Sequence, residues 1–195
     1  MTESRGRVTP APIAERVRAL EESLEAKGLV PDGFLERRTE QAEENFDWRN
    51  GARVVARAWV DPAFRARLLA DGASAAAELG FRAANSEYLV VLENTASVHN
   101  VIVCTQCSCT AWSVIGLPPD WYKSPEYRAR LVREPRVLLR EMGLDVPEDV
   151  AIRVWDTSAE TRYMVLPLRP PGTEGWSEEQ LAAVVTREAL IGVAR

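Results

Sequence analysis

Residues 88–109 read YLVVLENTASVHNVIVCTQCSC, and this segment sets the architecture of the chain. Residues 88–92 and 98–103 are strand-length runs rich in β-branched residues, separated by a turn signal at residues 93–95. The second run leads directly into a cluster that contains every cysteine of the chain: Cys104, Cys107 and Cys109. The segment therefore predicts two strands and, at the end of the second, a loop of converging thiols.

The spacing of the cluster, Cys-x-x-Cys-x-Cys, indicates metal binding. The run is too tight for a disulfide framework that spans the fold, and three thiols leave one over whichever pair is bridged. Three thiolates that converge on one point suit a soft or borderline metal ion. Once the sulfurs of Cys107 and Cys109 bind one metal, the backbone nitrogens of Ser108 and Cys109 are drawn beside it. The loop can therefore supply amide nitrogens as well as sulfurs.

Composition is that of a globular protein with one ordinary domain plus appendages. The chain has 195 residues, of which 46% are hydrophobic and 27% charged. A net charge of −5 without a basic stripe argues against a nucleic-acid partner. No apolar run is long enough to span a bilayer, and residues 1–12 lack a secretory pattern. Three thiols fit a reducing compartment, so we expect a cytoplasmic protein with no membrane partner.

Residues 1–80 are expected to form a helical N-terminal arm. Its first helix begins at Pro12, ends at Gly28 and carries an apolar stripe of Ile13, Val17, Leu20 and Leu24. Further helices are expected at residues 31–45, 52–59, 62–72 and 73–79. The arm either folds back on the rest of the chain or wraps a partner subunit, because exposed apolar stripes mark interaction surfaces.

Residues 81–195 are expected to form an α/β body that binds the metal and performs catalysis. Beyond the cluster, the pattern predicts helices at residues 124–132 and 135–142, strands at 150–155 and 162–168, and a final helix from the capping box of Ser177 and Gln180 to about Leu190. The predicted class is α+β: an N-terminal helical extension followed by a layered α-β-β-α body that carries the metal loop.

Other interpretations of the cluster remain open at this stage. A structural zinc site would take His99 as its fourth ligand, in a non-catalytic subunit whose loop is only held together by the metal. Cys104 and Cys107 also have the spacing of a redox pair, but no helix N-terminus clearly follows them. A triad hydrolase is excluded, because His99 is the only histidine and no nucleophile-elbow sequence is present.

The cluster and its surroundings resemble the α subunit of nitrile hydratase. The resemblance rests on VCTQCSCT at residues 103–110, GLPP at 116–119 and WYK at 121–123. It extends to RNGA at 49–52, ARAW at 56–59, ENT at 93–95, HN at 99–100, YRAR at 127–130, RYMVLP at 162–167 and GTEGWS at 172–177. Thiocyanate hydrolases share the cysteine loop, but the WYK continuation and the overall match favour nitrile hydratase.

The resemblance implies one trivalent cobalt or iron ion per chain and the hydration of a nitrile to an amide. Cys104 would be the axial thiolate, Cys107 a sulfinate and Cys109 a sulfenate. The amide nitrogens of Ser108 and Cys109 would complete the metal plane, which leaves the sixth position open to water or nitrile. Cys107, Ser108 and Cys109 would therefore be catalytic as well as metal-binding, with attack on the nitrile by hydroxide or the sulfenate oxygen.

The resemblance also implies partners. A β subunit, as a single or a split chain, would supply arginines to the oxidised sulfurs, so that the active site lies at the subunit interface. An accessory protein would deliver the metal. Thr105 favours cobalt, whereas residues 110–112 resemble iron-type members.

Several positions depart from the family pattern. Gln106 replaces Leu, Ser113 replaces Pro, Asn85 replaces Gln, and Ala83 and Ser86 replace glycines. These departures are either neutral or the mark of a specialised enzyme, such as one that hydrates a nucleoside nitrile.

Overall fold

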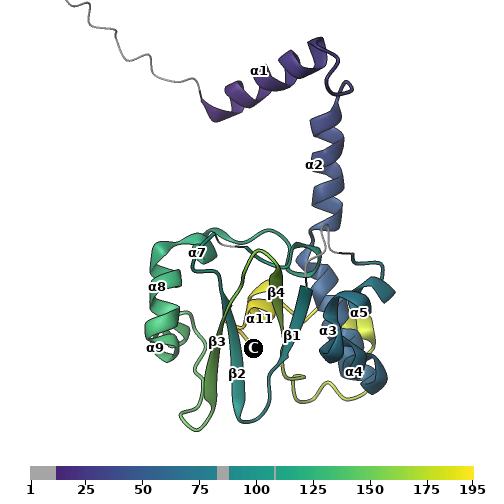
Figure 1. Ribbon diagram of the computed structural model, residues 1–195. Helices are drawn as coiled ribbons and strands as arrows, with labels where there is room; N and C mark the ends of the chain where they lie inside the picture. The colour runs from purple at the N-terminus through teal and green to yellow at the C-terminus, as the bar shows by residue number, and fades with distance from the viewer. Residues whose placement is uncertain (1–11, 83–87, 108) are drawn as a thin grey trace, which may run out of the picture. The chain divides into compact units, whose positions relative to one another are not determined.

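The computed structural model describes residues 12–82, 88–107 and 109–195 (Figure 1). The chain forms two compact units, residues 1–43 and residues 44–195. The first unit contains α1 (Ile13–Ala26) and most of α2 (Phe34–Asn45). No helix in the described ranges is long and apolar enough to cross a membrane.

The expected apolar stripe of α1 is present and open to solvent in this chain. Ile13 is 76% exposed, Val17 48% and Leu20 60%. The helix contains no buried residue, and the chain leaves it through Gly28, whose φ of 64° lies in the left-handed region. The described residues of the chain therefore leave the apolar stripe of α1 largely uncovered.

The second unit contains the remaining elements. They are α3 (Trp48–Val60), α4 (Pro62–Ala70), α5 (Gly72–Glu78), β1 (Tyr88–Glu93), β2 (Val98–Val103), α6 (Trp112–Ile115), α7 (Asp120–Lys123), α8 (Pro125–Arg133), α9 (Pro135–Glu141), β3 (Ala151–Asp156), β4 (Thr161–Leu166), α10 (Glu178–Ala182) and α11 (Arg187–Ile191). Many of these helices begin at a side-chain cap that accepts from a first-turn amide, as Asp47, Asp61, Asp71, Ser124, Ser177 and Thr186 do.

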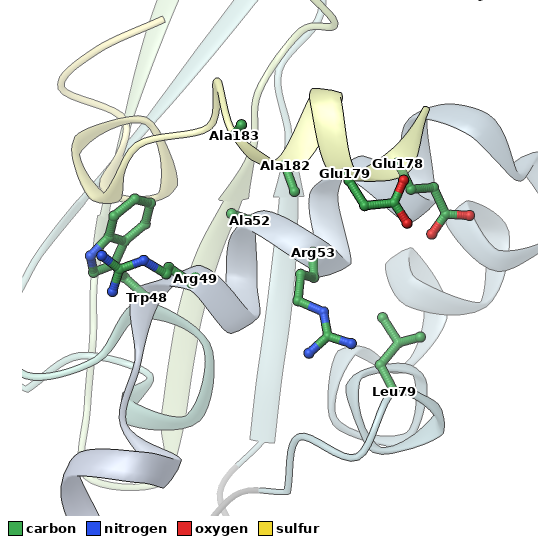
Figure 2. A pocket seen from close by; sticks show the side chains of 9 residues that line it. All are labelled: Trp48, Arg49, Ala52, Arg53, Leu79, Glu178, Glu179, Ala182 and Ala183. Atoms are coloured by element: carbon green, nitrogen blue, oxygen red, sulfur yellow. The ribbon is translucent and has the colours of Figure 1, made fainter. Parts of the chain in front are cut away.

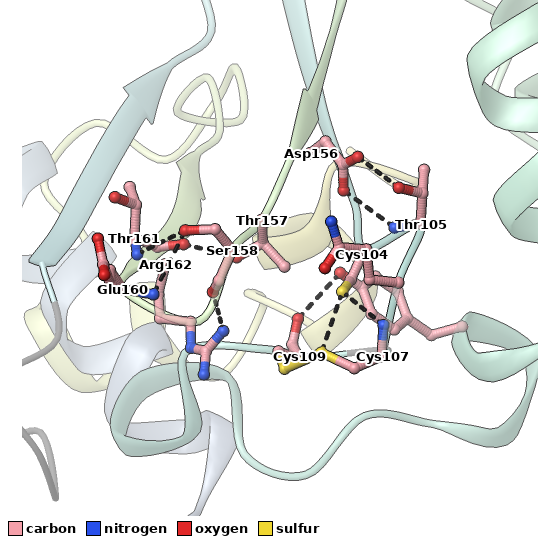
Figure 3. The surroundings of a disulfide bond; sticks show 12 residues. Cys104, Thr105, Cys107, Cys109, Asp156, Thr157, Ser158, Glu160, Thr161 and Arg162 are labelled. Atoms are coloured by element: carbon pink, nitrogen blue, oxygen red, sulfur yellow. Dashed lines mark hydrogen bonds between the residues drawn. A yellow bond between two sulfur atoms is a disulfide. The ribbon is translucent and has the colours of Figure 1, made fainter.

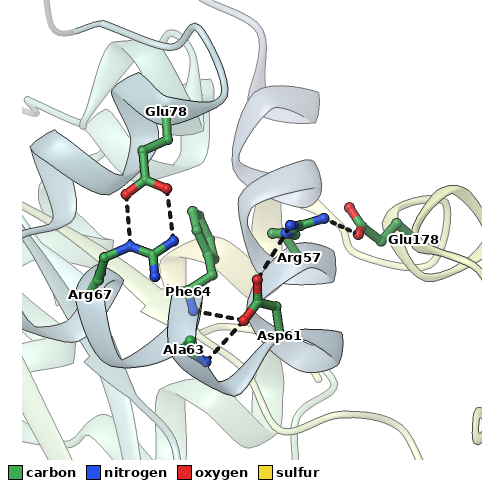
Figure 4. A network of polar contacts seen from close by, with 7 residues as sticks. All are labelled: Arg57, Asp61, Ala63, Phe64, Arg67, Glu78 and Glu178. Atoms are coloured by element: carbon green, nitrogen blue, oxygen red, sulfur yellow. Dashed lines mark hydrogen bonds and ion pairs between the residues drawn. The ribbon is translucent and has the colours of Figure 1, made fainter.

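The corner between α3 and α4 shows how such a cap is built into a wider polar network (Figure 4). Asp61 Oδ1 accepts from the amides of Ala63 at 3.0 Å and Phe64 at 2.9 Å. These amides, the Phe64 amide above all, hold the pKa of Asp61 below its usual value. Arg57 lies 3.3 Å from the same carboxylate and donates to Glu178 at 2.7 Å, which ties α3 to α10.

The four strands form two parallel pairs. β1 pairs with β4, starting with Tyr88 opposite Thr161, and β2 pairs with β3, starting with Val98 opposite Ala151. Parallel partners need a long crossover, and residues 104–150 supply the one between β2 and β3. Because β2 and β3 end at the same edge, Val103 lies opposite Asp156 and the cysteine loop begins beside the end of β3.

Helices lie on both sides of the two strand pairs (Figure 1). α9 contacts β3 on one side, and α4 and α5 contact β1 on the other. The core between them includes fully buried residues of α3, β2 and β4, among them Val54, Val55, Val101, Val103 and Met164. This arrangement confirms the expected α+β class with a helical N-terminal part.

Several elements differ from the sequence-based expectation. The prediction of a single final helix was wrong. The capping box of Ser177 and Gln180 forms, but α10 ends at Ala182 and a new helix starts at Arg187. Thr186 causes this break, because its side chain accepts from the Ala189 amide and caps α11. The short helices α6 and α7 were not predicted, since four residues carry no periodic signal.

Candidate metal centre

The three cysteines meet at the carboxyl end of β2. Their sulfur atoms all lie within 4.8 Å of one another, and Cys104 Sγ is 3.5 Å from Cys107 Sγ. Cys104 is fully buried, Cys109 is half-buried and Cys107 is exposed. The cluster therefore has a closed side at Cys104 and an open side at the other two sulfurs. Ser108, the remaining expected ligand, lies outside the described residues.

Two interactions hold the sulfurs in the loop. The Cys107 amide donates to Cys104 Sγ at 3.2 Å, which stabilises negative charge on that sulfur. Cys107 and Cys109 are joined by a disulfide with their Cα atoms 5.7 Å apart (Figure 3). A metal is bound by thiolates, so this bridge must open before both sulfurs serve as ligands. The cluster otherwise fits a metal, because three soft donors converge on one point.

The start of the loop is anchored to β3. Asp156 Oδ1 accepts from the Thr105 amide at 2.9 Å, and Oδ2 accepts from the Thr105 hydroxyl at 2.5 Å (Figure 3). The parallel register between β2 and β3 brings Asp156 to this place. Thr105 is thus a structural anchor of the loop. The sequence analysis missed Asp156, although a carboxylate directly after a predicted strand was a usable signal.

A cluster of aromatic side chains supports the cysteine loop. Tyr122 donates to the Cys109 carbonyl at 3.2 Å, and Tyr127 donates to the Ile102 carbonyl at 2.7 Å. The Trp121 ring lies 4.9 Å from that of Tyr127. Burial raises the pKa of Tyr122, and the negative charges of Cys104 and Asp156 raise it further. Tyr122 therefore stays protonated and remains a donor.

The exit of the loop is fixed by backbone contacts. Thr110 donates to the Gly116 carbonyl at 2.7 Å, which closes residues 110–116 into a turn around α6. Ser113, one of the departures from the family pattern, lies inside α6, and its carbonyl accepts from Asn50 at 3.1 Å. Trp112 packs against Phe46 with 5.3 Å between ring centroids. Asn85, Ala83 and Ser86 lie outside the described residues.

Arg162 adds positive charge near the loop. It lies on β4, is 7% exposed and donates to the Ser158 carbonyl (Figure 3). Its charge opposes the rise of the Tyr122 pKa, so the guanidinium acts on the groups beside the loop. The sequence analysis did not assign this arginine a role, because its nearness to Tyr122 results from the folding of the chain and not from the local sequence.

His99 does not belong to the cluster. Five residues separate it from Cys104 along β2, which corresponds to about 16 Å of extended strand. Its Nε2 lies 2.7 Å from the Gly192 carbonyl and therefore donates to it, while Nδ1 accepts from the Asn94 amide group at 3.3 Å. The proposed zinc site with His99 as fourth ligand is therefore wrong.

The position of His99 predicts a pH dependence of stability. Burial lowers the pKa of His99, and the positive charge of Arg195 lowers it further, although the bond to Gly192 opposes this. The unfolded chain then binds a proton near pH 6.5 that the folded chain does not, so stability falls as pH drops below this value. We expect the free energy of unfolding to fall by at most about 1.4 kcal/mol per pH unit between pH 6.5 and 5.5. Urea denaturation of the wild type and the His99→Gln variant measures this, and equal slopes would disprove it.

One further cavity, of about 490 Å³, lies between α3 and α10 (Figure 2). Its lining residues are Trp48, Arg49, Ala52, Arg53, Leu79, Glu178, Glu179, Ala182 and Ala183. None of the predicted site residues lines it.

Fold and loop together define a protein that presents a cysteine cluster for a metal at the edge of a mixed α/β body. The family model described as nitrile hydratase, alpha chain, matches residues 11–194. The chain belongs to the nitrile hydratase alpha-chain family.

Relatives within this family differ in metal and reaction. The alpha subunit of the low-molecular-weight cobalt-containing nitrile hydratase of Rhodococcus rhodochrous is 54% identical over 93% of this chain and 87% of its own length. A double mutant of the iron-type nitrile hydratase of Comamonas testosteroni Ni1 superposes with a TM-score of 0.89 at 51% identity, covering 96% of this chain and 92% of that one. The gamma subunit of thiocyanate hydrolase from Thiobacillus thioparus is 41% identical over 95% of this chain and 83% of its own length.

Proposed function

We propose that this chain is the catalytic alpha subunit of a nitrile hydratase, which converts a nitrile to the corresponding amide. The observation that carries the proposal is the convergence of three cysteine sulfurs within 4.8 Å, on the loop that the family sequence specifies. Hydration adds the oxygen of water to the nitrile carbon, and both protons of the water end on the amide nitrogen.

The metal ligands are the sulfurs of Cys104, Cys107 and Cys109 and the backbone nitrogens of Ser108 and Cys109. One trivalent ion per chain, when bound, supplies the Lewis acidity that polarises the nitrile. Cobalt is the proposed ion because Thr105 follows the first cysteine, and the cobalt-containing relative supports it. Iron is the alternative, because the superposable structure from Comamonas testosteroni is iron-type.

The three cysteines have different tasks. Cys104 is buried and bonded to the Cys107 amide, so it holds the closed side of the site. Cys107 and Cys109 lie on the open side, where their oxidised sulfurs face the substrate. We assign to the sulfenate oxygen of Cys109 the task of attacking the nitrile carbon or accepting a proton from the attacking water. We count Cys107 and Ser108 with the catalytic residues because they would hold the same metal.

The site needs a partner subunit. Thr105, Gln106 and Cys107 are exposed, so water reaches the loop of the isolated chain. A β subunit, single or split, would cover the loop and pair its positive charges with the oxidised sulfurs. The N-terminal arm, assigned to residues 1–80, would wrap this partner chiefly through the exposed stripe of α1. An accessory protein would load the metal.

Co-expression with the β partner, or partners, tests the proposal. Elemental analysis should find one cobalt or iron per chain. Mass spectrometry of the peptide that carries the cluster should find two added oxygens on Cys107 and one on Cys109. Zinc with three unmodified thiols in the assembled complex would reject the proposal.

Turnover assays separate the reaction from its closest alternative. The same complex is offered acetonitrile, a nucleoside nitrile and thiocyanate. Amide formation from a nitrile without thiocyanate turnover supports a nitrile hydratase, whereas the reverse would assign the chain to the thiocyanate hydrolases, as the 41% identical relative would suggest. Preference for the nucleoside nitrile would indicate a specialised enzyme, in which Gln106 and Asn85 depart from the family pattern because the substrate differs.

A further inference from the structure

One arginine outside the cluster reaches into the cysteine loop. Arg128 lies on α8, 22 residues after Gln106, and its guanidinium bonds two backbone carbonyls. Nη2 donates to the carbonyl of Lys123 at 2.7 Å, and Nη1 donates to the carbonyl of Gln106 at 3.4 Å. The first bond fixes the guanidinium at the end of α7, and the second places its charge beside the Gln106 carbonyl of the cysteine loop.

The Gln106 carbonyl belongs to the same peptide group as the Cys107 amide. That amide donates to Cys104 Sγ at 3.2 Å. One planar peptide unit is therefore held at its oxygen by Arg128 and at its N–H by the buried cysteine sulfur. A hydrogen bond to the oxygen of a peptide polarises the group and strengthens the bond that its N–H donates.

The charge of Arg128 is not neutralised by a carboxylate within residues 12–82, 88–107 and 109–195. Its Nε is buried, and no acceptor for it lies in these ranges. A guanidinium that is always charged therefore lies partly buried beside the cysteine loop.

We propose that Arg128 is a positioning residue of the metal loop, which acts on Cys104 through the peptide group between Gln106 and Cys107. It sets the orientation of that peptide and withdraws electron density from the Cys104 sulfur. The inference rests on the proposed function, since it assumes that Cys104 binds the metal.

The test compares the assembled, cobalt-loaded complex with three variants. Arg128→Gln removes the charge and the pair of hydrogen bonds to the two carbonyls. Arg128→Lys keeps the charge but leaves one ammonium group to donate to both carbonyls. Arg133→Gln is the matched control, because Arg133 lies on the same helix and donates only to the Ala129 carbonyl of that helix. The readouts are the energy of the sulfur-to-metal charge-transfer band and the rate of metal loss to a chelator.

We expect Arg128→Gln to shift the charge-transfer band to lower energy, since a less strongly hydrogen-bonded sulfur gives up its electron more readily. Metal loss should become about tenfold faster, as for other residues that support a metal ligand. Arg128→Lys should lie between Arg128→Gln and the wild type, and Arg133→Gln should match the wild type. If Arg128→Gln does not assemble, the smaller shift of Arg128→Lys decides the question.

An unchanged band and an unchanged rate of metal loss in the Arg128 variants would overturn the inference while leaving the proposed function intact. Equal effects of Arg133→Gln would also overturn it, because they would indicate a general disturbance of α8. A wild-type complex that binds no cobalt or iron would reject the proposed function, and the inference with it. The wild-type and variant arms thus report on the two proposals separately.

Discussion

Replacing Cys104 with alanine is expected to abolish metal retention and nitrile hydration together. Cys104 is the fully buried member of the cluster, and its sulfur accepts the hydrogen bond of the Cys107 amide. Without it the loop loses its inner ligand and the acceptor that orders the turn between the first two cysteines. Loss of metal affinity should exceed the roughly 10–100-fold that removal of an outer supporting residue produces. Elemental analysis and an amide-formation assay of the complex measure both effects.

Cys104→Ser is the companion variant. It preserves the volume of the side chain and a hydrogen-bond acceptor but replaces a soft sulfur with a hard oxygen, which suits cobalt or iron in this setting poorly. It should lose metal nearly as completely as Cys104→Ala. Circular dichroism should show unchanged secondary structure in both variants. A Cys104→Ser complex with full metal content would contradict the assignment of the sulfur as a ligand.

Replacing Gly51 with alanine is expected to destabilise the fold, although alanine is the better helix former. Gly51 lies in α3, where the helix backbone passes directly against α6. An added Cβ would lie 2.7 Å from Leu190 Cδ1 and still closer to the backbone oxygen of Val114. Helix propensity alone predicts a gain of about 0.5–1 kcal/mol. Overpacking against backbone, which has no rotamer to escape into, should outweigh it and lower the free energy of unfolding by about 1–3 kcal/mol.

Urea denaturation of this chain alone, without a partner subunit, measures the change in the free energy of unfolding. Arg53→Ala is the control, since Arg53 is exposed on the same helix and its replacement removes only a contact with the Phe81 ring at 5.0 Å, which should change stability by no more than about 1 kcal/mol. A Gly51→Ala variant as stable as the wild type would mean that α6 moves away from α3 readily. Because α6 follows the exit of the cysteine loop, the same variant should also release metal faster.

The parts of the fold that local sequence determines were predictable. β1 and β2 begin and end within a residue or so of the predicted runs, and Asp61, Ser124 and Ser177 cap helices as expected. The pairing of strands was not predictable, because residues 94–160 lie between β1 and β4. Helix α3 is amphipathic like α1, yet it packs on α6 within the unit of residues 44–195. A hydrophobic stripe does not reveal which surface will cover it.

The same distinction holds at the site. The cysteine cluster could be found from spacing, since its members are five residues apart at most. Arg128 and Arg162 could not, because the packing of the folded chain brings them beside the loop from distant positions, whereas Asp156 directly follows a predicted strand and could have been singled out. His99 lies near the cluster in sequence, but the direction of β2 carries it to the other end of the strand.

Several side chains hold the main chain of the loop, among them Asp156 at the Thr105 amide. Tyr122 bonds the carbonyl of Cys109, and Arg128 bonds that of Gln106. Neither contact depends on which side chain stands at position 106, so that position is free to diversify without loss of the loop conformation. Gln106 is exposed, so its side chain can vary while the main chain of the loop keeps its position. The contacts that fix the loop are thus separate from the side chain that is free to change.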